Sequence, residues 1–151
     1  MTDTFEARNP NYARHVEQLV LAMPIARFVG LRFLEILPGS VTVEIPLREE
    51  LTFRSDQFQA AAIFAAADFA AVPACATLLP EDWLFATIDC SLKIVGPATG
   101  KRLIAHGRVL KPGRLLTVAA AEVFVERGGH RELIATALAT ARNIEPAKAR
   151  T

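Results

Sequence analysis

Residues 60–79 read AAAIFAAADFAAVPACATLL, twenty positions with one charged residue, Asp68, and one proline, Pro73. A helix that is apolar on every side must be surrounded by apolar material, either lipid or the rest of its own fold. At about 1.5 Å per residue the stretch spans roughly 30 Å, which is enough to cross a bilayer. Half of it is alanine, however, Asp68 opposes insertion, and Glu81 and Asp82 follow without a Lys/Arg cluster. The stretch therefore predicts a helix buried inside a folded domain.

The rest of the chain has the pattern of strands. In residues 40–47, Val41, Val43 and Ile45 alternate with polar residues, which is typical of a strand with one buried face. Further strands are predicted over residues 31–37, 84–94, 102–110, 115–126 and 132–142, and a short amphipathic helix over 14–23. The order is therefore helix, two strands, the apolar helix and four strands.

One antiparallel sheet needs a cover for its apolar face, and the apolar helix supplies it. We predict an α+β domain in which a six-stranded antiparallel sheet curls around the central helix. Residues 48–56 are expected to form a polar loop, with Ser55 or Asp56 as the N-cap of that helix.

Composition limits the classes of function. The chain has 151 residues, is 52% hydrophobic and carries a net charge of +1, so no global field attracts nucleic acid or a membrane surface. We expect one domain over residues 1–151, loosely ordered at 1–11 and 145–151. No signal peptide is evident, and Cys75 and Cys90 suit a reducing compartment, which indicates a soluble cytoplasmic protein. The sequence holds no cluster of metal-ligand residues.

Three stretches carry a resemblance to a known family: QAAAIFAAADFAA (59–71), FATIDCSLKIVGPATGKRLIAHGRVLKPGRLLTVAAAEV (85–123) and ELIATALATARNI (132–144). With the order of elements, they resemble the hot-dog fold, and specifically the acyl-CoA thioesterases of the phenylacetate-degradation type. The resemblance implies hydrolysis of an acyl-CoA thioester to a free acid and coenzyme A. It also implies a homodimer or a dimer of dimers, in which the acid of one chain faces the helix start of the other.

The resemblance assigns roles to four residues. Asp68 matches the family's catalytic acid, and Thr87 matches a Ser/Thr that often lies near it. Gln59, Ala60 and Ala61 stand where the family has a His-Gly-Gly-like motif, so the acid is kept while the helix start departs from the pattern. The implied catalytic set is Asp68, the Ala60 amide, Gln59 and Thr87.

The chemistry of these groups fits thioester hydrolysis. A carboxylate can activate water or attack the carbonyl carbon, and a backbone N–H at a helix N-terminus can bind the developing oxyanion. Other readings remain open. Asp68 can instead be a structural group bonded to Thr87, Thr87 an ordinary strand threonine, and Gln59 a polar residue that faces solvent.

Substrate-binding residues are suggested by charge and by aromatic side chains. Residues 101–114 carry five Lys/Arg and no acid, and the Lys111, Gly113 and Arg114 hairpin suits the phosphates of coenzyme A. The alternative is a solvated strand edge protected by its cations. Phe53, which replaces an Asn or Gln common in the family, Phe58 and Phe64 are candidate walls for the acyl group.

No cofactor is expected beyond coenzyme A as part of the substrate, and neither nucleic acid nor a membrane is an expected partner. Two other functions stay open at this point. The diverged helix start also suits a non-catalytic acyl-CoA or acyl-ligand binding protein on the same fold. The third possibility is a structural oligomer without a small-molecule ligand.

Overall fold

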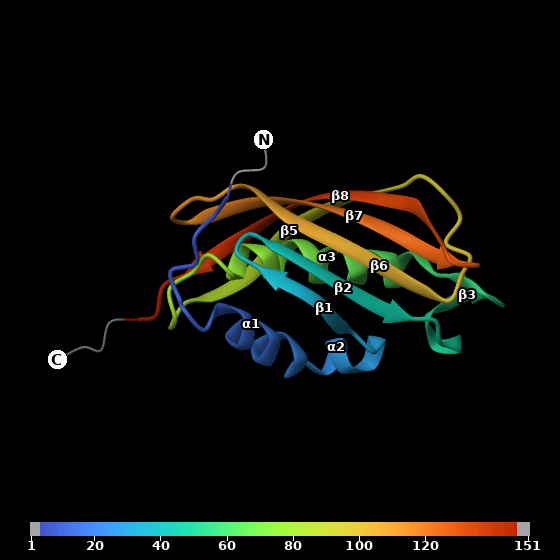
Figure 1. Ribbon diagram of the computed structural model, residues 1–151, viewed down its shortest axis with the longest axis horizontal. Coiled ribbons are helices and arrows are strands. Elements are labelled where there is room, and N and C mark those ends of the chain that lie inside the picture. The colour runs from blue at the N-terminus through green and yellow to red at the C-terminus, as the bar shows by residue number, and fades with distance from the viewer. Residues whose placement is uncertain (1–3, 148–151) are drawn as a thin grey trace.

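The central helix forms where the alanine-rich stretch predicts it. The computed structural model describes residues 4–147, and α3 spans Ala60–Ala76. From Ala66 to Ala76 every residue except Asp68 is buried. Figure 1 shows the sheet curling around this helix, as the sequence predicts.

A six-stranded antiparallel sheet surrounds α3, in the order β1-β2-β6-β7-β8-β5. The strands are β1 (Arg32–Leu37), β2 (Ser40–Pro46), β5 (Leu84–Ile94), β6 (Arg102–Lys111), β7 (Leu116–Arg127) and β8 (His130–Ile144). The edges are β1 and β5. Since β6 lies between β2 and β7, the alternative reading of residues 101–114 as a protected sheet edge is wrong.

Helix and sheet approach each other closely because both present small side chains. Ala70 and Ala71 of α3 lie above Gly107 of β6, where a Cβ atom would stand only 2.1 Å from the Ala70 carbonyl oxygen. On β7, Ala119 and Ala121 are buried against the same core. A larger side chain on this face of β6 would push the helix out of the sheet's concave side.

Two short helices precede the sheet (Figure 1). The helix predicted over residues 14–23 is α1 (Tyr12–Leu21), which buries Val16 and Val20. The next helix, α2 (Pro24–Val29), is not predicted. Pro24 begins α2 rather than only ending α1, because proline at the first helical position loses no intrahelical hydrogen bond.

The segment before α3 is more ordered than the predicted polar loop. It contains the 3₁₀ turn η1 (Glu49–Leu51) and a small hairpin of β3 (Thr52–Arg54) and β4 (Gln57–Phe58). The predicted N-cap at Ser55 or Asp56 is wrong. The hairpin extends to Phe58, so Gln59 becomes the N-cap and its side chain accepts the Ala61 N–H.

The N-terminal segment packs onto the core. Asn9 is buried and Phe5 contacts the hydrophobic cluster, so the described part of residues 1–11 is not the loose segment expected. Residues 145–147 follow β8 without helix or strand and are exposed, in keeping with the expectation for 145–151. Residues 1–3 and 148–151, on which the rest of the expectation falls, lie outside the described residues. Between residues 4 and 147, no helix combines the length and the hydropathy that a membrane span requires.

Candidate active site

Asp68 interrupts the buried run of α3 and lies opposite β5. Its carboxylate Oδ1 accepts a hydrogen bond of 2.9 Å from Thr87 Oγ1 on that strand. Met23, Phe85 and Val72 line a cavity of about 100 Å³ beside the pair. The two residues that the sequence analysis assigns to the acid and its neighbour are therefore in direct contact.

The surroundings of Asp68 favour its neutral form. Burial raises the pKa of the Asp68 carboxyl above its ordinary value, and the hydrogen bond from Thr87 lowers that pKa in part. A carboxylate with a raised pKa is a better proton acceptor than an ordinary aspartate. This property suits a general base, because proton transfer becomes more efficient as the pKa of the base approaches the pKa of the group that gives up the proton.

Neither cysteine offers a competing nucleophile. Burial raises the pKa of the Cys75 thiol to about 12. Burial and the negative charges of Asp68 and Asp89 raise the pKa of the Cys90 thiol to about 11. Both stay protonated near neutral pH, and it is the thiolate that attacks. Among the described residues, no group of three or more His, Cys, Asp or Glu side chains could hold a metal ion.

The start of α3 presents an amide without an acceptor. The Gln59 side-chain oxygen bonds the Ala61 N–H, and the Gln59 carbonyl accepts from Ala62 and Ile63. Within residues 4–147, no acceptor takes the N–H of Ala60, which is exposed. The predicted oxyanion donor is therefore available, whereas the Gln59 oxygen is already used in capping the helix.

Asp68 and the Ala60 amide lie on the same exposed stripe of α3 but far apart. The other members of this stripe are Ala61 and Phe64, which are exposed, and Ala65, which is half-buried like Asp68; all lie at the spacing of one helical face. Eight residues at about 1.5 Å each separate Ala60 from Asp68 by roughly 12 Å along the axis. One thioester carbonyl cannot contact both groups of a single chain.

The three candidate phenylalanines have different surroundings. Phe53 is 64% exposed, with the Arg54 guanidinium 5.5 Å from its ring centroid. Phe64 is 40% exposed, halfway between Ala60 and Asp68 on the exposed stripe. Phe58 is buried, so it forms the floor of a groove of about 230 Å³ beside Ala60 rather than a free wall.

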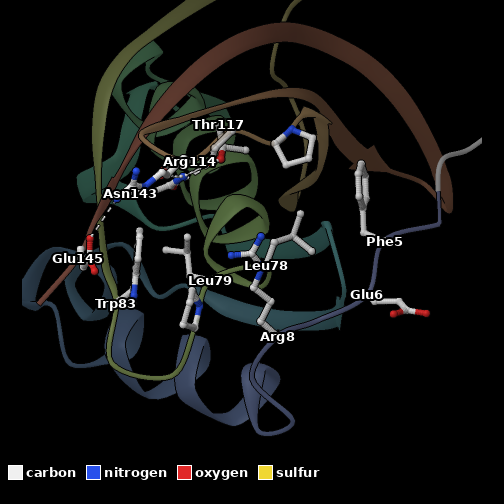
Figure 2. Close-up of a pocket in the computed structure, with 13 residues that line it drawn as sticks. Phe5, Glu6, Arg8, Leu78, Leu79, Trp83, Arg114, Thr117, Asn143 and Glu145 are labelled. Atoms are coloured by element: carbon white, nitrogen blue, oxygen red, sulfur yellow. Dashed lines mark hydrogen bonds and ion pairs between the residues drawn. The ribbon is translucent and has the colours of Figure 1, made fainter.

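The basic hairpin lies at the other end of α3. Gly113 and Arg114 border a pocket of about 540 Å³, whereas Lys111 is exposed and does not line it. Figure 2 shows Phe5 and Arg8 from the N-terminal segment and Trp83 from the loop after α3 around this pocket. The hairpin residues are therefore not adjacent to the Ala60 amide of the same chain.

Not every cation of residues 101–114 is free to bind a ligand. Arg102 forms ion pairs with Glu44 and, at 2.9 Å, with Glu126 on the neighbouring strands. Its guanidinium thus contributes to the sheet. Asn143, which the sequence analysis did not single out, fixes the hairpin instead, because its Nδ2 donates to the Gly113 carbonyl at 2.8 Å.

A solved structure of a thioesterase family protein from Silicibacter pomeroyi is 31% identical to this chain, with a TM-score of 0.85 over 88% of this chain and 98% of the other. The chain belongs to the thioesterase superfamily. No protein-family model and no curated protein matches its sequence.

Two more distant members of the superfamily share the fold. The E. coli PaaI protein from the phenylacetic acid degradation operon has a TM-score of 0.79 at 14% identity, over 92% of this chain and 97% of its own. A thioesterase from Haemophilus influenzae has a TM-score of 0.78 at 15% identity, over 99% and 98%. The hot-dog fold that the sequence resemblance implies is thereby confirmed.

Sequence reasoning missed two surfaces of this superfamily member. The first is a groove between α2 and α3. The sequence signals that could have predicted α2 are Pro24, at the first position of the helix, and Gly30, which follows the end of the helix in the left-handed conformation. The second is the set of pocket residues around the hairpin, Arg8 and Trp83, which are far apart in sequence and carry no local signal.

Proposed function

We propose that this protein is an acyl-CoA thioesterase that hydrolyses a thioester to a free acid and coenzyme A. Asp68 takes a proton from water, whose oxygen bonds to the carbonyl carbon, or attacks that carbon itself and forms an acyl anhydride, which water then cleaves to release the free acid. The Ala60 N–H binds the oxyanion. When the carbon–sulfur bond breaks, the thiolate leaves and is protonated. A thiol has a pKa of only about 8.5, so this leaving group needs no dedicated acid.

One observation carries the proposal: a partly buried carboxylate with a raised pKa shares one exposed helical stripe with an unbonded amide. The roughly 12 Å between Asp68 and Ala60 requires a second chain to bring the two groups together. Thr87 orients the carboxylate, and Gln59 supports the site by capping the helix.

The second chain is a copy of the same chain in a homodimer. β5 is an edge strand of eleven residues with exposed apolar side chains such as Ile88, 54% exposed, and such an edge favours pairing. When a two-fold axis pairs β5 with itself, the two α3 helices run antiparallel. With Phe64 near the axis, Ala60 of each chain faces Asp68 of the other. Two such dimers can associate further.

The large pocket suits the nucleotide end of coenzyme A. Arg8 and Arg114 offer guanidinium groups for phosphates, and a phosphate would replace the exposed Glu145 carboxylate that lies 3.9 Å from Arg114. The Gly113 hairpin offers backbone amides, and Trp83 offers a ring for stacking. The pocket begins just beyond the C-terminal end of α3, about 12 Å past Asp68, which an extended pantetheine arm can bridge. Lys111, which is exposed and does not line the pocket, adds positive charge to the same hairpin. Such a substrate is a metabolite of the cytoplasm.

Complementation between two inactive variants tests the shared site. Ala60→Pro removes the proposed oxyanion donor while keeping the helix, because proline is favoured at the first helical position and Gln59 is already extended. We expect kcat to fall by about 10²–10³. Mixed one to one with Asp68→Asn after dissociation and reassociation, the pair should regain about a quarter of wild-type activity, since half of the dimers then hold one intact site.

The complementation experiment needs two controls. Each variant alone, taken through the same dissociation, must stay inactive, and sizing in solution must show dimers before and after mixing. Activity that remains absent although mixed dimers have formed would contradict the shared site, and a stable monomer with full activity would exclude it.

The pH profile tests the role of Thr87. Thr87→Val removes the hydrogen bond that lowers the pKa of Asp68, so the acid limb of kcat/KM should move to higher pH. We expect several-fold lower activity on that limb and near wild-type activity at about pH 8. Thr87→Ser keeps the O–H donor and should restore the wild-type profile. An unchanged limb in Thr87→Val would show that this hydrogen bond does not tune the reacting group.

A non-catalytic acyl-CoA binding protein is the second candidate. It is favoured by the helix start, where Ala60 and Ala61 replace glycines and the Gln59 oxygen is taken up by the Ala61 N–H. In this case calorimetry would detect tight binding of acyl-CoA, whereas a thiol-release assay over a panel of acyl-CoA substrates would detect no turnover.

A further inference from the structure

The segment between β2 and α3 carries an arginine whose charge has no partner. Arg48 Nε and Nη2 are buried, and no atom of residues 4–147 accepts a hydrogen bond from either. The guanidinium lies 5.7 Å from the centroid of the Phe28 ring, and a Cβ atom on Gly30 would stand 3.9 Å from its Cζ. A buried donor without an acceptor is costly, and the contact with one ring offsets that cost only in part. The buried nitrogens therefore indicate an acceptor from outside the chain.

A second arginine borders the same space. Arg48 and Arg54 both line an open pocket of about 580 Å³. Arg54 lies over the exposed Phe53 ring, 5.5 Å from its centroid, and its Nε donates only a long bond of 3.4 Å to Gln57 Oε1. Within the described part of the chain neither arginine forms an ion pair, whereas Arg102 pairs with two acids on the neighbouring strands. Two guanidinium groups without an acid partner thus border one pocket.

The donors of this pocket suit a phosphate group. Thr52 and Ser55 add hydroxyl groups to the two guanidinium groups. Thr52 Oγ1 already donates to the Glu49 carbonyl at 2.7 Å, so Ser55 remains as the hydroxyl donor. A phosphate group carries a charge of about −1.5 to −2 and three acceptor oxygens, enough for both guanidinium groups and one hydroxyl. A carboxylate has only one charge and two oxygens.

One carboxylate opposes an anion in the pocket. Glu49 lines it as well, in the 3₁₀ turn η1, but is exposed and pairs with neither arginine. Two arginines and one glutamate leave the lining with a net charge of +1. Because the Coulomb energy scales with the charge of the ligand, a doubly charged group is attracted about twice as strongly as a singly charged one. The lining therefore favours a phosphate over a carboxylate.

The pocket is connected to the start of α3. The Leu51 carbonyl accepts the Gln59 N–H at 2.9 Å, and Gln59 is the N-cap of the helix. Arg54 contacts Gln57, the first residue of β4, which ends directly before this N-cap. An anion that fixes the arginines therefore also fixes the segment that leads to Ala60.

We propose that this pocket binds a phosphate group, held by Arg48, Arg54 and Ser55. Arg48 contributes Nη1, the guanidinium nitrogen that is not buried, and a turn of the guanidinium away from the Phe28 ring brings Nη2 to the phosphate. The pocket beside the 111–114 hairpin of the same chain lies at the other end of α3, roughly 25 Å away. The phosphate group belongs either to a free phosphate-bearing metabolite or to coenzyme A bound to the second chain of the proposed homodimer.

Calorimetric titration with inorganic phosphate, at about pH 8 and constant ionic strength, tests the site. Arg54→Gln and Arg48→Met should each weaken binding at least about tenfold, the loss expected for one charge-assisted hydrogen bond. Methionine keeps the packing on Phe28, and Arg54 is exposed, so at least one variant folds. Glu49→Gln should strengthen binding several-fold because it removes the opposing charge. Arg108→Gln, at an exposed position of β6 that borders none of these pockets, is the matched control.

Competition with coenzyme A distinguishes the two sources. If coenzyme A displaces phosphate and binds more weakly to Arg54→Gln, the phosphate group is its own, and if phosphate binds equally with coenzyme A present, the ligand is a separate metabolite. Either result supports the site. The inference is overturned if wild type binds neither ligand, if acetate binds as tightly as phosphate, or if Arg114→Gln weakens phosphate binding while Arg48→Met and Arg54→Gln do not. None of these titrations requires turnover, so they decide the site whether or not the protein releases thiol from an acyl-CoA.

Discussion

Asp68→Asn is expected to lower kcat for thioester hydrolysis by at least about 100-fold, because positioned general bases contribute about 10²–10⁴ to rate. Asparagine keeps the shape of the side chain, and its carbonyl oxygen can still accept the Thr87 hydroxyl. It cannot take a proton from water or attack a carbonyl. A thiol-release assay measures the loss, with Asp82→Asn in the exposed turn after α3, away from β5, as the matched control.

The same variant should fold at least as stably as wild type near neutral pH. Burial raises the pKa of Asp68 in the folded chain, so the folded state binds this proton more tightly than the unfolded chain. Stability is therefore lost as pH rises from the ordinary aspartate pKa through the raised one, and it stays lower above it. Asparagine removes this dependence, and we expect a gain of about 0.5–1 kcal/mol near neutral pH.

Thermal unfolding of both proteins at about pH 4 and pH 8 checks this sign. A destabilised Asp68→Asn would mean that the carboxylate is a structural group, the alternative reading left open by the sequence. Activity within a few-fold of wild type would exclude Asp68 as the base or nucleophile, whatever the stability.

The fold could be predicted because its main signals are local. Twenty nearly uncharged residues require burial, and Val41, Val43 and Ile45 alternate at the period of a strand. The structure adds the strand order, which depends on pairings between distant segments. That order explains why the basic residues 101–114 lie on an internal strand and why Arg102 pairs with Glu44.

The candidate site could be predicted only in part. The contact of Asp68 with Thr87 follows from a helix crossing one strand, and the resemblance named both residues. The α2–α3 groove could not be found, because it arises where two helices separated by thirty residues of chain diverge, and Phe28 has no periodic pattern that would mark it as exposed. Local patterns specify elements, whereas grooves depend on how elements pack.

Gly107→Ala should destabilise the fold by at least about 3 kcal/mol, near the upper end of what overpacking causes. A Cβ atom at Gly107 would lie 2.1 Å from the Ala70 carbonyl oxygen and 2.6 Å from the Ala71 nitrogen. Both are backbone atoms inside α3, so no side-chain rotation relieves the clash. The helix would have to move away from β6 along its whole buried length. Chemical denaturation measures the free energy of unfolding, and a fall of roughly 10 °C in Tm is expected.

Gly96→Ala is the matched control, since its added Cβ would meet its nearest neighbour, the Leu133 carbonyl oxygen, at an ordinary 3.5 Å. We expect a change within about 0.5 kcal/mol. If Gly107→Ala unfolds like Gly96→Ala, α3 and β6 are not in the close contact that makes glycine necessary at position 107. A much larger loss of stability in Gly107→Ala than in Gly96→Ala supports the close packing of α3 on β6. This packing places Asp68 against Thr87 and Ala60 at the exposed end of the stripe. A displaced helix would move both groups together. Gly107→Ala that still folds should therefore lose activity as well, although it touches neither group.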